Sequence, residues 1–153
     1  YAPAKYIDGD EIKVVMRDVA NDIAILETKK ASAPALQLAV EAPEFLQTVF
    51  IVGHPFGFPD AIITYGVIAH PSTQFTEEPP FNRPFMLINA AGAPGNSGSP
   101  VINDQDEIVS VIQIGWDRVF SAVMGGATWE MLEKYRSYWE PTPFPNNHDL
   151  AHP

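Results

Sequence analysis

Ala-Gly-Ala-Pro-Gly-Asn-Ser-Gly-Ser-Pro-Val-Ile-Asn, at residues 91–103, is the stretch from which the fold of this chain is inferred. Its first serine, Ser97, has Gly95 two positions before it and Gly98 directly after it. Glycines leave the serine hydroxyl uncrowded and let the backbone turn so that the amides of Gly95 and Ser97 converge on one point. Two amides that converge beside a nucleophile form an oxyanion hole, usually the largest electrostatic contribution to acyl transfer. The stretch predicts a nucleophilic serine, with a tight structural turn as the alternative.

Gly-Asn-Ser-Gly-Ser-Pro followed by an apolar strand resembles the nucleophile segment of trypsin-like (chymotrypsin-fold) serine proteases. The resemblance is closest to the bacterial branch that contains glutamyl endopeptidases and HtrA-type proteases. It implies an all-β fold, a chymotrypsin-like double β-barrel with a C-terminal α-helix. It also implies a serine endopeptidase that forms an acyl-enzyme at Ser97 and needs neither a cofactor nor a metal.

Three further segments match the same family in the same order. Residues 19–26 resemble the segment whose aspartate orients the catalytic histidine, and this implies Asp22 for that role, with Asp18 as the second candidate. Residues 49–57, which contain Gly-His-Pro-Phe-Gly, are similar to a strand that ends in Gly-Asn-Pro-Phe-Gly. Residues 62–69 match the strand that follows. Together these matches extend the resemblance over most of the chain.

The histidine of a Ser-His-Asp triad is not found where the family places it. It precedes the aspartate by roughly 45 residues in the chymotrypsin order, whereas residues 1–21 contain no histidine. His54 is expected to be a loop residue, and the pair His148 and His152 is not expected to bind a metal. The chain is therefore expected to begin inside the first barrel, with the histidine upstream of Tyr1. Three explanations stay open: the sequence is a part of the protein, the histidine half is a separate chain that completes the barrel, or the fold is a degenerate protease.

Composition excludes several classes of partner. The formal net charge is −10, from 19 acidic and 9 basic residues, so nucleic acid and anionic membranes are not expected as partners. No run of 18 apolar residues predicts a membrane span. Cysteine is absent, which excludes disulfides. A secreted or periplasmic location is implied by the family resemblance alone.

The expected organisation has four parts. Residues 1–30 are the C-terminal part of the first barrel, residues 31–35 cross between barrels, residues 36–140 form the second barrel and its helix, and residues 141–153 are an extended tail. Periodic apolar residues predict a helix from Thr128 to Trp139. Short β-branched and aromatic runs predict strands near 12–16, 23–27, 36–40, 48–53, 61–69, 85–90, 99–103, 107–114 and 119–124, with 71–84 as a loop.

The resemblance also implies a specificity pocket. Its base corresponds to Ala91, Gly92 and Ala93, and one wall corresponds to Ile112, Gln113, Ile114 and Gly115, with a second wall at about 122–125. None of these residues is charged, and Ile112 stands where glutamyl endopeptidases place a histidine. We therefore expect an apolar pocket for medium side chains at P1, the substrate residue before the cleaved bond. The backbone of 113–115 is expected to bind the polypeptide substrate as an added strand.

Two functions follow as hypotheses. The first is a serine endopeptidase in which Ser97 attacks the substrate, the amides of Gly95 and Ser97 stabilise the oxyanion, and Asp22 holds a histidine that is expected upstream of Tyr1. The alternative is a catalytically inactive, protease-like structural or binding module in a larger assembly, which the missing histidine favours.

Overall fold

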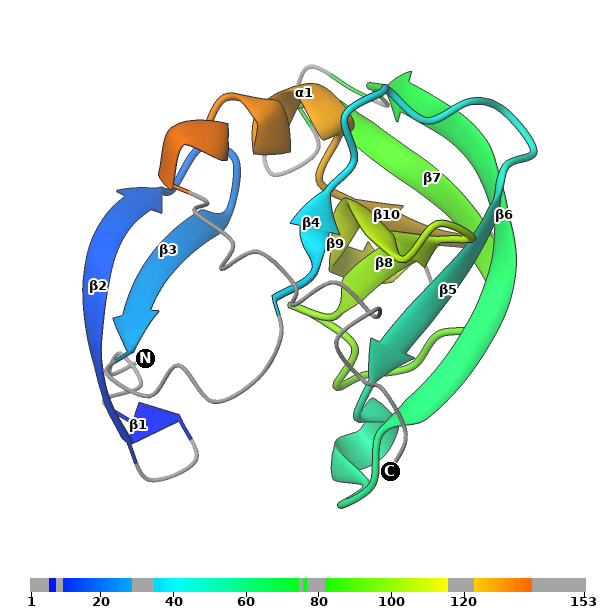
Figure 1. Cartoon of the computed structure of the whole chain (residues 1–153). Coiled ribbons are helices and arrows are strands. Elements are labelled where there is room, and N and C mark those ends of the chain that lie inside the picture. The colour runs from blue at the N-terminus through cyan, green and yellow to red at the C-terminus, as the bar shows by residue number, and fades with distance from the viewer. Residues whose placement is uncertain are drawn as a thin grey trace, which may run out of the picture. The chain divides into compact units, whose positions relative to one another are not determined.

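Short runs of β-branched and aromatic residues form strands through most of the chain, because such side chains pack well on a pleated surface. The computed structural model describes residues 6–7, 10–28, 35–74, 76, 82–115 and 123–138. Within these ranges the chain is all-β with one short α-helix, and it divides into two units between Ala35 and Leu36 (Figure 1). The predicted fold class is confirmed.

The N-terminal unit contains one antiparallel sheet with the order β1 (Tyr6–Ile7), β2 (Asp10–Asp18), β3 (Ile23–Thr28). The turn between β2 and β3 is closed by Asp18, whose carboxylate accepts hydrogen bonds from the backbone amide of Asn21 at 3.0 Å and its side-chain amide at 2.7 Å. Asp22 follows with a positive φ of 54°. Aspartate tolerates this left-handed conformation better than most residues do.

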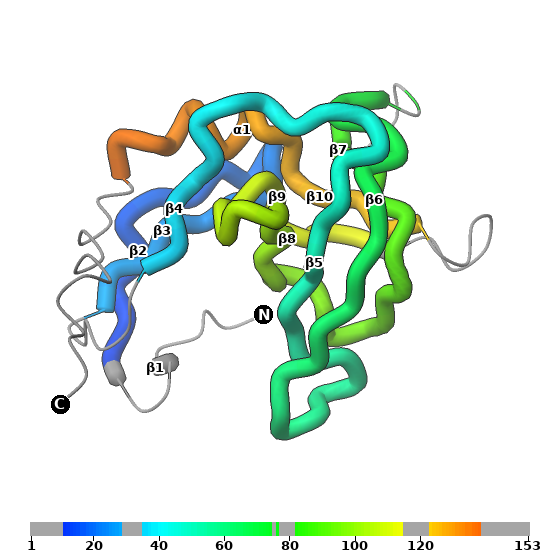
Figure 2. Tube along the Cα trace, turned by 45° about the vertical axis from the view of Figure 1, so that its right-hand side comes forward, coloured from blue at the N-terminus to red at the C-terminus, as the bar shows by residue number. Residues whose placement is uncertain are grey.

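The C-terminal unit is a closed barrel of six antiparallel strands (Figure 1). Its order is β10 (Val123–Gly126), β7 (Phe85–Ala90), β6 (Ile62–Thr73), β5 (Thr48–Gly53), β8 (Pro100–Asn103), β9 (Glu107–Gly115). The pairing of β9 with β10 closes the ring, so these strands leave no open edge between them. The short β4 (Gln37–Leu38) adds to β9 in parallel. Figure 2 shows β5 and β6 as neighbours joined by a loop at the bottom of the view, which contains the 3₁₀ turn Pro55–Gly57.

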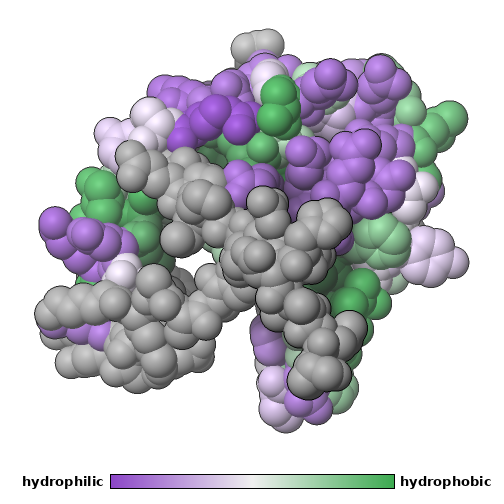
Figure 3. All heavy atoms as spheres, viewed as in Figure 1, coloured by the Kyte–Doolittle hydropathy of each residue, from purple (hydrophilic) through white to green (hydrophobic). Residues whose placement is uncertain are grey.

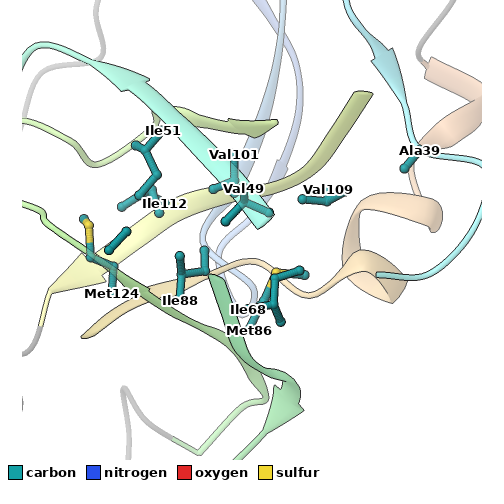
Figure 4. Packing of buried hydrophobic residues seen from close by; sticks show 11 residues of the cluster. Ala39, Val49, Ile51, Ile68, Met86, Ile88, Val101, Val109, Ile112 and Met124 are labelled. Atoms are coloured by element: carbon teal, nitrogen blue, oxygen red, sulfur yellow. The ribbon is translucent and has the colours of Figure 1, made fainter. Parts of the chain in front are cut away.

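Alternating residues of the barrel strands fill its interior (Figure 4). Successive side chains of a strand point to opposite faces, and β5 shows the resulting alternation, with Val49 and Ile51 buried and Thr48 and Phe50 exposed. The buried cluster consists of Ala39, Val49, Ile51, Ile68, Met86, Ile88, Ala90, Val101, Val109, Ile112 and Met124.

The outward residues of β5 and β6 include several large apolar side chains. Phe50 lies opposite Tyr65 and Val52 lies opposite Ile63 in the strand register. Tyr65 and Ile63 are well exposed. Figure 3 shows hydrophobic residues mixed with hydrophilic ones on the side of the barrel where Figure 1 places β6.

Most predicted strands of the barrel are confirmed, with two differences. The predicted loop 71–84 begins later than expected, because β6 continues through Pro71 to Thr73. Irregular register between His70 and Thr73 accommodates a residue that lacks a backbone donor. Most of the predicted strand 119–124 lies outside the described residues. Its last two residues, Val123 and Met124, begin β10.

The predicted helix over 128–139 is shorter than its periodicity indicates. Thr128 caps helix α1 (Trp129–Glu133), and a 3₁₀ turn follows at Arg136–Tyr138. Arg136 donates hydrogen bonds to the carbonyls of Leu38 and Ala39, which hold this last turn against the β4 segment. Trp139 lies outside the described residues. No helix in the described ranges has the length and apolar character needed to span a membrane.

Candidate active site

Ser97 is the second residue of the second of two consecutive turns that connect β7 to β8. The amide of Asn96 donates to the carbonyl of Ala93 at 3.1 Å, and the amide of Ser99 donates to the carbonyl of Asn96 at 2.9 Å. Each turn has glycine at its third position, with a φ of 104° at Gly95 and 88° at Gly98. Positive φ at the third residue is the requirement of a type II turn, and glycine meets it without steric cost. Ser97 is exposed in the second turn.

Three backbone amides of the segment from Gly95 to Ser99 donate hydrogen bonds within the barrel unit. Asn96 and Ser99 donate within the turns, and Gly98 donates to the carbonyl of Ile112 on β9 at 2.7 Å. The amides of Gly95 and Ser97 donate no hydrogen bond to any of the described residues. These are the two donors that the sequence predicts for an oxyanion hole.

The loop after β5 holds the first turn in place. The amide of Phe56 donates to the carbonyl of Pro94 at 2.6 Å. Because the carbonyl and the amide of one peptide point in opposite directions, this bond directs the amide of Gly95 away from Phe56. Phe56 itself has a φ of 55°. The loop is closed by a contact of 2.9 Å between Nδ1 of His54 and the carbonyl oxygen of Phe58.

Gly95 packs directly against this loop. A Cβ atom at residue 95 would lie 2.5 Å from the carbonyl oxygen of His54 and 3.0 Å from the amide nitrogen of Phe56. Both contacts are with backbone, which cannot rotate away as a side chain can. Glycine is therefore required at residue 95 both for its conformation and for space.

Asn96 is buried beneath the turns and is 2% exposed. Its Oδ1 atom accepts no hydrogen bond from the described part of the chain. A buried acceptor without a partner costs about 1–3 kcal/mol, so this side chain is less favourable here than a fully hydrogen-bonded one would be.

The residues expected at the base and wall of the specificity pocket lie on three neighbouring segments. The carbonyl of Ala91 accepts a hydrogen bond from the hydroxyl of Thr64 at 2.9 Å. Ile112 is only 1% exposed and packs in the barrel core, while its backbone binds the nucleophile turn at Ser99. Met124 on β10 lies against Gly92.

Strand β9 continues beyond the end of β8. The pairing of the two strands ends where Val111 of β9 lies opposite Pro100, the first residue of β8. The next residue, Ile112, exchanges backbone hydrogen bonds with Gly98 and Ser99. The last residues of β9 pair with β10 on one side, Ile114 with Gly125 and Gly115 with Met124. The side chain of Gln113 accepts a hydrogen bond of 2.7 Å from Arg83.

Asp22, the residue expected to orient the histidine, lies in the other unit and is exposed at the start of β3. Asp18, the second candidate, forms the turn contacts to Asn21 described above, so its carboxylate has a structural function. His54 lies in the loop after β5, and His148 and His152 lie outside the described residues. No cluster of three metal-ligating side chains occurs among the residues that the structure describes.

Sequence reasoning missed two contributors to this site. Phe56 acts through its backbone, which no residue pattern reports, although the dipeptide Pro94–Gly95 that it contacts is typical of a type II turn. Arg83 reaches Gln113 only through the pairing of distant strands.

Comparison with known proteins finds one family model and several serine endoproteases that resemble this chain. Residues 7–111 match the family described as "Trypsin-like peptidase domain". A probable periplasmic serine endoprotease DegP-like of Pseudomonas fulva (strain 12-X) is 29% identical over 102 residues, which cover 66% of this chain and 21% of that protein. Protease Do-like 2, chloroplastic, of Arabidopsis thaliana is 33% identical over 103 residues, covering 65% and 17%. The chain thus spans about a fifth of the length of these relatives.

One solved structure supports the fold. Rv3671c from M. tuberculosis H37Rv, determined as an inactive serine-to-alanine mutant, superposes with a TM-score of 0.69 at 20% sequence identity. The superposition covers 88% of this chain and 68% of that one.

Proposed function

Because the chain belongs to the trypsin-like peptidase domain family, we propose that it carries the nucleophile and oxyanion hole of a serine endopeptidase that hydrolyses polypeptides. The observation that supports this most directly is the use of the backbone amides around Ser97. Asn96, Gly98 and Ser99 use theirs in turns and in binding β9, which leaves those of Gly95 and Ser97 for a ligand.

In the proposed reaction, Oγ of Ser97 attacks the carbonyl carbon of the scissile bond. The negative charge that develops on the carbonyl oxygen is stabilised by the amides of Gly95 and Ser97. A histidine takes the seryl proton and passes it to the leaving amine, and water then hydrolyses the acyl-enzyme. We assign Asp22 to orient that histidine.

Substrate binding is proposed along the end of β9. The backbone of 113–115 extends past β8 with β10 on one side, so a polypeptide can add as a strand on the other side. The pocket base of Ala91, Gly92 and Ala93 has no charge and favours an apolar P1 residue. No metal or cofactor takes part in these steps.

Labelling of the complete gene product with a fluorophosphonate, followed by peptide mapping, tests the assignment. The expected result is modification at Ser97 and none in the Ser97→Ala variant, with hydrolysis of an unfolded protein substrate lost in parallel. A natively folded protein that is neither labelled at Ser97 nor active would favour the alternative, a protease-like binding module.

Location is proposed from the relatives alone. The Pseudomonas fulva relative is named as periplasmic and the Arabidopsis thaliana relative as chloroplastic. We propose a secreted or periplasmic location, which fractionation of the source cells with an antibody to this chain would test.

A further inference from the structure

The chain that leaves β7 is tied to β6 by a side chain before it reaches the nucleophile turns. The hydroxyl of Thr64 donates a hydrogen bond of 2.9 Å to the carbonyl of Ala91, which lies 27 residues further along the chain. Regular pairing between the two strands ends one residue earlier, where Gly66 lies opposite Ala90. The contact from Thr64 therefore holds the first residue beyond the ladder, at the start of the segment that leads to Ser97.

Strands β6 and β7 approach each other closely at this point. A Cβ atom at residue 66 would overlap the carbonyl oxygen of Asn89 and would lie 2.6 Å from Cβ of Ala90. Glycine at residue 66 permits this approach. The short side chain of Thr64 can then reach the carbonyl of Ala91.

The packing of residue 64 does not require a hydroxyl. Thr64 lies opposite Ile51, which is 1% exposed and belongs to the buried cluster, and residues opposite each other share a face of the sheet. The neighbours of Thr64 in the strand, Ile63 and Tyr65, are exposed on the other face. Valine has nearly the shape of threonine and is equally favourable in a strand, so the hydrogen bond to Ala91 is what distinguishes threonine here.

The other end of the same segment is held by Pro94, whose carbonyl accepts the hydrogen bond from the amide of Phe56. Both anchors come from the β5–β6 hairpin, one from its second strand and one from its loop. Gly92 and Ala93, in the proposed pocket base, lie between them, and Gly95 follows directly. Because the carbonyl and the amide of one peptide point in opposite directions, fixing these two carbonyls also fixes the amides of Gly92 and Gly95.

We propose that Thr64 is a positioning residue of the active site, whose hydroxyl fixes the peptide after Ala91 and, through it, the conformation in which the amide of Gly95 receives the oxyanion. The inference rests on the proposed function and adds to it a residue outside the nucleophile segment. Without the hydroxyl, the barrel keeps its strand pairing, but residues 91–95 lose one of their two anchors. The amide of Gly95 is then correctly directed in a smaller fraction of the molecules, which lowers kcat.

Two variants of the complete gene product separate positioning from packing. Thr64→Val keeps the shape and removes the hydroxyl, whereas Thr64→Ser keeps the hydroxyl and removes the methyl group. One neutral hydrogen bond corresponds to about a 2- to 10-fold change in an equilibrium. Thr64→Val should therefore lower kcat by about 2- to 10-fold, and Thr64→Ser should restore most of it. Packing alone would give the opposite order, because valine is favoured in strands and serine lacks the methyl group.

Three measurements are made on each variant: kcat and KM for a peptide substrate, the rate of fluorophosphonate labelling at Ser97, and the urea midpoint. Labelling should slow in parallel with kcat, because the phosphoryl oxygen of the probe also needs the oxyanion donors. Thr73 provides the matched control, since it is a half-buried threonine at the far end of β6, opposite Phe85. Its valine and serine variants should keep the wild-type kcat and labelling rate.

The outcomes separate the two proposals. Slower turnover and labelling in Thr64→Val, with rescue in Thr64→Ser and no change in the Thr73 variants, supports the assignment. A folded Thr64→Val variant with the wild-type kcat overturns it and leaves the peptidase function in place. A Thr64→Ser variant that loses as much kcat as Thr64→Val does the same, because the hydroxyl is then not the group that matters. Absence of hydrolysis and of Ser97 labelling in the wild type overturns the peptidase function and this inference with it.

Discussion

Substitution of Gly95 by alanine should disrupt the site more than the same change at Gly98, although both glycines have positive φ. At Gly98, with a φ of 88°, an added Cβ meets nothing within 4 Å. At Gly95, with a φ of 104°, it meets the backbone oxygen of His54 at 2.5 Å and the backbone nitrogen of Phe56 at 3.0 Å. The pair therefore separates conformational strain from steric overlap.

The expected magnitudes follow from these contacts. A non-glycine residue in the left-handed region costs about 1–2 kcal/mol, and this is the whole expected loss for Gly98→Ala. Overpacking adds about 1–3 kcal/mol, so Gly95→Ala should lose roughly 2–5 kcal/mol of unfolding free energy. Displacement of Phe56 would also weaken its hydrogen bond to Pro94 and release the amide of Gly95 from its orientation. Loss of one oxyanion donor lowers kcat by about 10²- to 10³-fold.

Urea unfolding followed by tryptophan fluorescence measures the stabilities, and kcat is measured on the complete gene product. The reasoning predicts a clear gap between the two variants in both measurements. Equal stability losses at the two glycines, or a Gly95→Ala variant that keeps the wild-type kcat, would refute it.

Three further changes test the site and its support. Ser97→Ala should lower kcat by about 10⁶-fold while leaving stability within about 0.5 kcal/mol of the wild type, because Ser97 is exposed. Asn96→Asp buries a carboxyl group whose pKa is raised by burial, so the folded state resists ionisation. Urea titrations should show a loss of roughly 3–5 kcal/mol at pH 8. The loss should shrink as the pH falls and disappear below about pH 3, under the unfolded-state pKa of about 3.9, where the group is neutral in both states. A loss independent of pH would contradict this. Trp129→Phe removes the 3.0 Å hydrogen bond to the carbonyl of Ala39 and should lower the unfolding free energy by about 0.5–1.5 kcal/mol, with an unchanged midpoint as the contrary result.

Local patterns predicted most of the barrel because strand formation depends on features that are visible over a few residues. The hairpin of β8 and β9 is an example. Its turn residue Asn103 accepts hydrogen bonds from the amides of Gln105 and Glu107 through its own side chain, at 3.0 and 2.8 Å. Asparagine favours turns through this kind of contact. The C-terminal helix was overestimated because its length depends on Arg136 binding the carbonyls of Leu38 and Ala39, which are remote in sequence.

The sequence by itself determined the all-β class, the position of Ser97 and the need for glycine on either side of it, because these depend on short-range conformational preferences. Only the tertiary structure decided which amides remain available beside Ser97, and that Phe56 directs the amide of Gly95 through Pro94. It also decided that Met124 occupies the space over Gly92. The physical reason is that the closure of the barrel brings together segments far apart in the chain, and the contacts between them follow from strand register that local patterns do not encode.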